Sequence, residues 1–125
     1  MNGLCVLLVE DEAHLLEMTA EMLEMHGVQV RRALNAQQAL SVLETHGAPD
    51  LLITDHAMPG QMTGLELIAR VRGQWPALKA VLVSGFAPAQ LPPIPGDVTY
   101  LPKPYRVKHL LELLEPLTGG AAPQR

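Results

Sequence analysis

The sequence is poor in cysteine and in long apolar stretches. Cys5 is the only cysteine among 125 residues, so no disulfide can form within the chain, which suits a reducing compartment. No apolar run approaches the roughly 20 residues that are needed to cross a bilayer. The N-terminal residues lack the basic segment and apolar core of a signal peptide. We therefore expect a cytoplasmic protein without a membrane-inserted segment.

Basic residues are also few. Lys and Arg number nine against 13 Asp and Glu, which gives a formal net charge of −4, and like charges do not cluster. A nucleic-acid surface needs clustered Lys and Arg to neutralise phosphates, so we expect no nucleic-acid partner. The length suits one domain, and we find no internal repeat or boundary. We predict a domain over residues 1–118 and a flexible tail over residues 119–125.

Short apolar runs alternate with helical patterns along the chain. The runs predict strands at 4–9, 28–34, 51–54, 80–83 and 98–101. The helical periodicities predict helices at 13–26, 36–46, 64–73 and 106–114, with Asn35 as the N-cap of the second. Strands that alternate with helices form a parallel sheet with right-handed crossovers.

Proline interrupts this alternation in two places. Residues 87–96 hold four prolines, and a proline inside a helix lacks a backbone donor and clashes with the preceding turn. The fourth helix should therefore be short, irregular or absent. Pro116 and the segment TGGAAPQR predict that the last helix ends by Leu114 and that the residues after it are mobile.

The first predicted helix carries a methionine stripe. Leu15, Met18, Met22 and Leu23 share one face, whereas the glutamates lie on other faces. We interpret Met18 and Met22 as core residues, because methionine fills irregular gaps well, and we expect Met25 to be exposed.

Polar residues follow four of the five predicted strands. Glu10 and Asp11 follow the first strand, Asp55 the third, Ser84 the fourth and Lys103 the fifth. In open parallel sheets, ligand sites gather at the carboxyl ends of strands, near the point where the strand order reverses. We therefore expect these side chains to form one pocket.

Such a pocket would hold three carboxylates and one ammonium group. Carboxylates at close range raise one another's pKa, and a bound hard cation relieves the repulsion. Magnesium uses few carboxylates, keeps several waters and pairs readily with phosphoryl oxygens. A carboxylate beside such a cation suits phosphoryl transfer, with Lys103 balancing charge and Ser84 able to hydrogen-bond a phosphoryl oxygen.

Four strings occur in order, each around the end of a strand: LLVEDE, LLITDHAMPG, VLVSG and YLPKPY. Together they resemble the receiver domain of bacterial response regulators and hybrid histidine kinases, over about residues 4–115. The resemblance implies a doubly wound α/β fold of flavodoxin-like topology, with strand order 2-1-3-4-5. It also implies a phosphoacceptor that takes a phosphoryl group from a histidine kinase or a histidine phosphotransfer protein and relays the signal by conformational change.

The resemblance assigns a metal site as well. Asp55 matches the phosphoacceptor, and Asp11 matches the acid that binds the cation directly. Glu10 matches a neighbour that holds the cation through water, and the backbone carbonyl of Ala57 matches the third protein ligand. With Asp55, these residues would bind Mg²⁺ or Mn²⁺.

The remaining matches concern the response to phosphorylation. Ser84 matches the switch hydroxyl and Tyr100 matches the aromatic residue whose rotamer responds to phosphorylation. Lys103 matches the family's lysine, whose bond to the following proline, here Pro104, is cis in such domains. The chain would not be an enzyme, apart from self-phosphorylation and self-dephosphorylation chemistry, and we expect a monomer or a weak dimer.

Some features depart from the common pattern. The loop HAMPGQMT is one residue longer than the commonest form, which favours receivers attached to hybrid kinases. Ala57 cannot orient a hydrolytic water through its side chain, so the rate of autodephosphorylation is open. No helix-turn-helix pattern follows Leu114, and we expect either a stand-alone receiver or a piece of a larger kinase.

Three other functions compete with this interpretation. An aspartyl phosphohydrolase usually places a general acid two residues after the nucleophile, where this chain has Ala57. A flavin-binding domain needs hydroxyl and N–H groups after its first strand, where this chain has EDE. A degenerate receiver would lack Asp11, Asp55 or Lys103, and phosphorylation by a small donor would separate it from an active one. Each residue taken alone also fits an ordinary helix-terminal charge or turn.

Overall fold

The computed structural model of the chain describes residues 3–58, 60 and 62–121, with side chains up to residue 117. Its five strands are β1 (Cys5–Val9), β2 (Gln29–Ala33), β3 (Leu51–Asp55), β4 (Lys79–Ser84) and β5 (Thr99–Pro102). They form one sheet in the order β2-β1-β3-β4-β5, and every neighbouring pair is parallel. The predicted strand order is confirmed.

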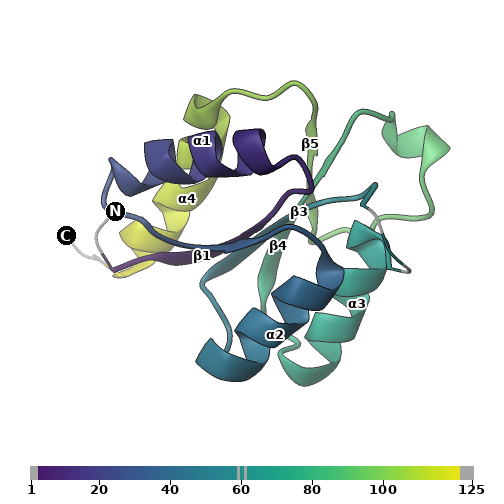
Figure 1. Cartoon of the computed structure of the whole chain (residues 1–125), viewed down its shortest axis with the longest axis horizontal. Coiled ribbons are helices and arrows are strands. Elements are labelled where there is room, and N and C mark those ends of the chain that lie inside the picture. The colour runs from purple at the N-terminus through teal and green to yellow at the C-terminus, as the bar shows by residue number, and fades with distance from the viewer. Residues whose placement is uncertain (1–2, 59, 61, 122–125) are drawn as a thin grey trace.

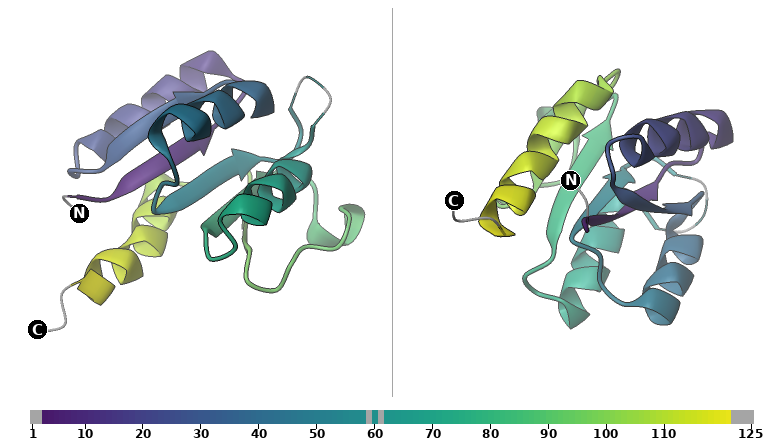
Figure 2. Two further views of the ribbon diagram at one scale, coloured as in Figure 1. Left: turned by 90° about the horizontal axis from the view of Figure 1, so that it is seen from below. Right: turned by 90° about the vertical axis from the view of Figure 1, so that its left-hand side faces the viewer.

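Within the described residues, four α-helices cover the two faces of the sheet. They are α1 (Ala13–Glu24), α2 (Ala36–His46), α3 (Gly64–Gln74) and α4 (Val107–Ala121). Figure 1 shows α1 and α4 on one face and α2 and α3 on the other, and the two turned views of Figure 2 show the same three layers. This is the doubly wound α/β architecture that the sequence predicts. None of the helices in the described ranges is long and apolar enough to cross a bilayer.

The apolar runs of the sequence form a core on both faces of the sheet. Leu8 of β1 packs in a cluster with Leu23 of α1 and Leu110 of α4. Its neighbour Leu7 belongs to the opposite cluster, with Leu67 of α3. Successive side chains of a strand point to opposite faces, so a strand that is covered on both faces reads as a continuous apolar run.

The helices of the second face begin with side-chain caps. Asn35 is the N-cap of α2, as predicted, and its Oδ1 accepts a hydrogen bond from the Gln38 N–H at 2.8 Å. Thr63 caps α3 through a reciprocal pair with Glu66: the Glu66 N–H donates to Thr63 Oγ1, and the Thr63 N–H donates to Glu66 Oε1. These bonds satisfy backbone donors that a helix start leaves without partners.

The methionine stripe of α1 faces solvent, contrary to prediction. Met18 and Met22 are 51% and 44% exposed, and Met25 is exposed as expected. The residues of α1 that are buried instead are Leu16, Thr19, Ala20 and Leu23. The methionines therefore lie to one side of the buried stripe.

The last helix continues beyond its predicted end. α4 runs from Val107 to Ala121 and contains Pro116, so the prediction that it ends by Leu114 is wrong. An interior proline destabilises a helix by about 3 kcal/mol. The half-buried Leu113 and Leu117 flank Pro116 and pack against the core, which offsets this penalty. The predicted boundary at residue 118 falls within α4 and stays a prediction, and residues 122–125 of the predicted tail lie outside the described residues.

The proline-rich crossover between β4 and β5 is irregular, as predicted. All of residues 85–98 are described, and within them the backbone forms a single 3₁₀ turn, η1 (Pro88–Gln90), and no α-helix. Leu91 and Ile94 are half-buried against the core cluster of α2 and α3. Most of the other residues in the segment are exposed. Whether the segment is more mobile than its neighbours stays a prediction.

Candidate functional site

The register of the parallel sheet brings the polar residues after the strands to one edge. Val9 of β1 pairs with Thr54 of β3, which sets Glu10 level with Asp55. Asp55 pairs with Val83 of β4, the residue before Ser84. Ser84 in turn pairs with Pro102 of β5, the residue before Lys103. The strand ends therefore place the predicted site residues side by side, one strand after the next.

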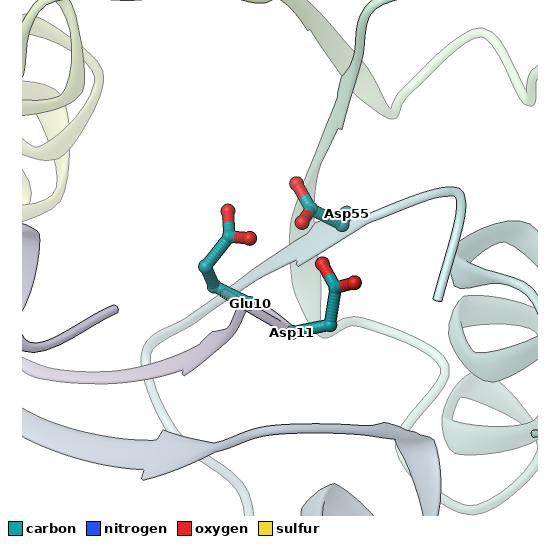
Figure 3. A group of neighbouring side chains, drawn as sticks. All are labelled: Glu10, Asp11 and Asp55. Carbon is teal, nitrogen blue, oxygen red and sulfur yellow. The ribbon is translucent and has the colours of Figure 1, made fainter. Parts of the chain in front are cut away.

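Three carboxylates converge at the ends of β1 and β3. Figure 3 shows the side chains of Glu10, Asp11 and Asp55 gathered there, and one oxygen of each lies within 4.8 Å of the others. Glu10 and Asp55 are buried, at 3% and 4% exposure, whereas Asp11 is exposed. A set of carboxylate oxygens with one open side matches the ligands that Mg²⁺ prefers, and it leaves room for waters.

Lys103 bridges the two buried carboxylates. Its Nζ lies 3.1 Å from Glu10 Oε1 and 3.0 Å from Asp55 Oδ1, and it donates to Asp55 Oδ2 at 3.1 Å. Its backbone N–H donates to the Ser84 carbonyl at 2.9 Å, and the bond between Lys103 and Pro104 is cis, as the resemblance implies. The lysine therefore acts as the counterion of both acids.

Burial and the close contacts shift the pKa values of these groups in different directions. Burial, reinforced by the Glu10 carboxylate, raises the pKa of Asp55 to about 8, and Lys103 only partly opposes this. Burial also disfavours ionised Glu10, but hydrogen bonds with Asp55, the Glu12 N–H and Lys103 outweigh it and lower the pKa of Glu10. Burial likewise disfavours charged Lys103, yet its bonds to both acids outweigh burial and raise its pKa. Asp55 is therefore harder to ionise than an ordinary aspartate, and a cation nearby would favour its ionised form.

Backbone contacts fix both buried acids in place. Glu10 Oε2 accepts a hydrogen bond from the Glu12 N–H at 3.0 Å. On β3, the hydroxyl of Thr54 donates to the Asp55 carbonyl at 2.9 Å, and the His56 N–H donates to the Val83 carbonyl at 2.9 Å. Sequence reasoning did not single out Thr54, although a hydroxyl in the otherwise apolar run LLIT is a signal that could have identified it.

Ala57 lies two residues after Asp55, at the start of the loop to α3, and it is exposed. Its side chain adds no polar atom to the pocket, which leaves its carbonyl as the group that could bind a cation. That role stays a prediction.

The two predicted switch residues meet at the backbone of Phe86. Ser84 is buried, and its Oγ accepts a hydrogen bond from the Phe86 N–H at 3.0 Å. The hydroxyl of Tyr100 donates to the Phe86 carbonyl and lies 3.4 Å from the Ser84 carbonyl. The side chain of Phe86 is 52% exposed. Phe86 was not predicted from the sequence, because its contacts use the backbone, which any residue type supplies.

An apolar groove borders the site on the side of α1 and α4. Its volume is about 430 Å³, and it is lined by Leu15, Met18, Thr19, Met22, Lys103, Pro104, Tyr105 and Val107. Burial raises the pKa of Tyr105, while a hydrogen bond with Thr19 opposes the rise. The surface beside Lys103 is therefore mostly apolar, and the exposed methionines of α1 belong to it.

Comparisons with known proteins agree with this geometry. Residues 6–115 match the family described as the response regulator receiver domain. A stretch of 109 residues, 84% of this chain, is 34% identical to the sensor kinase CckA of Brucella abortus (strain 2308), but it spans only 11% of that kinase. Over 119 residues, the chain is 32% identical to the response regulator receiver protein CpdR of the same organism, with coverage of 93% of this chain and 98% of CpdR.

A solved structure with the same fold comes from Thermotoga maritima. It is the response regulator protein TrrA in complex with Mg²⁺ and BeF, and it superposes with a TM-score of 0.74 at 27% identity. The match covers 94% of this chain and 99% of that one.

Proposed function

This chain belongs to the response regulator receiver domain family of two-component signalling, and from that premise we propose that Asp55 accepts a phosphoryl group from a phosphorylated histidine. One observation carries the proposal. Asp55 is buried at the end of β3, with Lys103 Nζ at 3.0 Å and the carboxylates of Glu10 and Asp11 beside it. This arrangement supports the proposal because it would supply a nucleophilic oxygen, an acid set able to bind a cation and a positive charge within one pocket.

The proposed transfer is a displacement at phosphorus. An ionised oxygen of Asp55 forms the new P–O bond while the P–N bond to the donor histidine breaks and the imidazole keeps the electron pair. Lys103 already contacts both Asp55 oxygens, so its ammonium would lie close to the phosphoryl oxygens and balance their charge. The product is an acyl phosphate on Asp55.

A divalent cation fits the site chemically. Glu10, Asp11, Asp55 and the Ala57 carbonyl would hold Mg²⁺ or Mn²⁺, which would supply charge neutralisation to the transferring group. The acids offer hard oxygen ligands, and Asp11 is exposed on the open side of the cluster. The complex of TrrA with Mg²⁺ supports this choice of ion.

The same geometry supports a switch at Ser84 and Tyr100. Ser84 Oγ now bonds the Phe86 N–H, and a phosphoryl group on Asp55 would offer it a charged acceptor instead. A turn of Ser84 toward that acceptor would release Phe86, whose carbonyl is bonded by Tyr100. The signal would then pass to the crossover of residues 85–98.

The partners follow from the donor chemistry. We propose that a histidine kinase or a histidine phosphotransfer protein supplies the phosphoryl group, in the cytoplasm. The matches to a small part of CckA and to nearly all of CpdR support a receiver that is either part of a kinase or stands alone. We further propose that the chain acts on no separate substrate as an enzyme, binds no nucleic acid, inserts in no membrane and is a monomer or a weak dimer.

Intact mass after incubation with acetyl phosphate and Mg²⁺ tests the proposed function. The wild type should gain one phosphoryl group, and Asp55→Asn should gain none. Asp50→Asn is the matched control, because Asp50 lies outside the site and asparagine can still accept the Cys5 N–H bond. A wild type that gains no mass, or an Asp55→Asn variant that gains it at the wild-type rate, would contradict the proposal.

A further inference from the structure

Gly64, the first residue of α3, lies directly against the backbone of the proposed phosphoacceptor. A Cβ on Gly64 would lie 2.1 Å from the Asp55 carbonyl oxygen, 2.8 Å from the Asp55 carbonyl carbon and 2.9 Å from His56 Cα. All three atoms are backbone atoms, so no side-chain rotation can make room. We propose that Gly64 is a positioning residue that sets Asp55 in register with the acids of β1, an inference that rests on the proposed function.

Backbone conformation does not explain the glycine. Gly64 has no positive φ, in contrast to Gly3, Gly27, Gly47 and Gly60. Glycine is also among the poorest helix formers, so a helical position favours almost any other residue. The reason for a glycine here is instead its close approach to the Asp55 backbone, which leaves no room for a side chain.

The helix cannot easily move away from the strand. The capping pair of Thr63 and Glu66 fixes the first turn of α3. Leu67 and Ile68, one turn further on, are fully buried in the core. The Gly64 N–H also donates to the His56 carbonyl at 2.9 Å, which ties the helix start to the strand end.

A side chain at position 64 would therefore press on the end of β3. The Asp55 carbonyl that it would strike is the oxygen that accepts the Thr54 hydroxyl. Relieving a 2.1 Å contact to an ordinary separation requires a displacement of about 1 Å. The three atoms nearest to such a Cβ belong to Asp55 and His56, whereas Glu10 and Asp11 follow β1, so Asp55 would shift relative to those acids. The turn to the Ala57 carbonyl would shift with it.

Gly64→Ala and Gly73→Ala form a matched pair within the same helix. In the described part of the chain, a Cβ on Gly73 would meet no atom within 4 Å. We expect Gly64→Ala to bind Mg²⁺ at least about tenfold more weakly and to accept phosphoryl from acetyl phosphate about 100-fold more slowly, because a 1 Å misplacement has an effect of that order. Gly73→Ala should match the wild type in both measurements.

The readouts separate positioning from mere destabilisation. Mg²⁺ titration and phosphorylation are measured below the unfolding temperature of each variant, on folded protein. A folded Gly64→Ala variant with wild-type Mg²⁺ affinity and rate would overturn the positioning role, even if it unfolds at a lower temperature. A wild type that neither binds Mg²⁺ nor accepts phosphoryl would overturn this inference and the proposed function together.

Thr54→Val gives a second, independent test should Gly64→Ala fail to fold. The substitution keeps the shape of a fully buried side chain and removes the hydroxyl that holds the Asp55 carbonyl. We expect a loss of Mg²⁺ affinity of about threefold to tenfold, since one neutral hydrogen bond fixes this carbonyl. Unchanged affinity in Thr54→Val would show that the position of the Asp55 backbone does not govern the site.

Discussion

The proline-rich crossover begins at the edge of the sheet that holds the acid pocket, yet the two regions are held in opposite ways. Glu10 and Asp55 are almost fully buried, and each contacts Lys103 as well as fixed neighbours. The crossover of residues 85–98 is mostly exposed and is anchored by the half-buried Leu91 and Ile94. Segments with few buried contacts open at low free energy, whereas reacting groups need fixed geometry. From this comparison we propose that the pocket carries the chemistry and that the crossover carries the response.

The two ends of the crossover have different tethers. At the end near the pocket, Phe86 is held by hydrogen bonds to Ser84 Oγ and from Tyr100. At the far end, the guanidinium of Arg72 donates to Asp97 and to the Leu78 carbonyl. The near tether contains a hydroxyl beside the proposed phosphorylation site, so we expect phosphorylation to change this tether rather than the far one.

The largest expected effect is on the free energy of unfolding, and it comes from removing the ionisable carboxyl group of Asp55. The pKa of Asp55 in the folded protein, about 8, lies above its ordinary value of 3.8, so the folded state keeps a proton that the unfolded chain loses between these values. The contribution of Asp55 to the free energy of unfolding of the metal-free wild type should therefore fall as pH rises from 4 to 8. Asp55→Asn removes this penalty, so its stability advantage over the wild type should be small at pH 4 and should grow by up to about 1.4 kcal/mol for each pH unit toward pH 8.

Urea unfolding at a series of pH values checks this expectation, with Asp50→Asn as the control for loss of an aspartate. Parallel pH profiles for Asp55→Asn and the wild type would show that burial of Asp55 carries no such penalty.

The next effect concerns the cation. Asp11→Ala should weaken Mg²⁺ binding by at least about 100-fold, because loss of a direct ligand should exceed the effect of losing a neighbouring group. Asp11→Ala should also relieve the repulsion between the remaining carboxylates and so raise the free energy of unfolding of the metal-free protein. Glu12→Ala is the matched control, since the Glu12 contact to Glu10 uses the backbone N–H and survives the substitution. Calorimetric titration measures both variants, and equal affinities would remove Asp11 from the site.

Lys103→Ala, also in the acid pocket, should have a smaller effect, which is a slower rate of phosphorylation. It removes the ammonium from Glu10 and Asp55, and we expect phosphorylation by acetyl phosphate to slow by about tenfold. The effect is limited because the lysine side chain is 31% exposed and solvent screens its charge. Lys108→Ala, an exposed lysine of α4, should react at the wild-type rate. Equal rates for the two variants would show that Lys103 is structural.

The smallest expected effect lies in the crossover. Tyr100→Phe removes the hydroxyl that bonds the Phe86 carbonyl and should speed amide exchange of Phe86 about fivefold, the equivalent of about 1 kcal/mol. Tyr105→Phe controls for loss of a tyrosine hydroxyl at the α1 and α4 side.

Hydrogen exchange with and without beryllofluoride should show the crossover loosening in the wild type. Good protection before activation and no change after it would make the segment a rigid linker.

The sheet and its polar edge were predictable because their signals are local. Strands buried on both faces are continuous apolar runs, and a polar residue after each run marks the carboxyl edge. The sequence also predicts the N-cap at Asn35 and the irregular crossover, since an N-cap residue and a proline each act on their own stretch of backbone.

Other features depend on packing between distant segments. Met18 and Met22 have core-like side chains, yet the face of α1 that is buried carries Leu16, Thr19, Ala20 and Leu23. The continuation of α4 through Pro116 depends on Leu113 and Leu117 packing against the core. The contact of Gly64 with Asp55 joins two residues across a loop, and sequence periodicity carries no signal for it.

Borohydride reduction of the phosphorylated protein tests the central claim most directly. Hydride converts an aspartyl phosphate to homoserine, so peptide mass spectrometry identifies the carboxylate that carried the phosphoryl group. After acetyl phosphate and Mg²⁺, we predict homoserine at position 55, with Glu10 and Asp11 unchanged. Reduction at either of those acids, or at no residue of a protein that has gained phosphoryl mass, would contradict the assignment of Asp55.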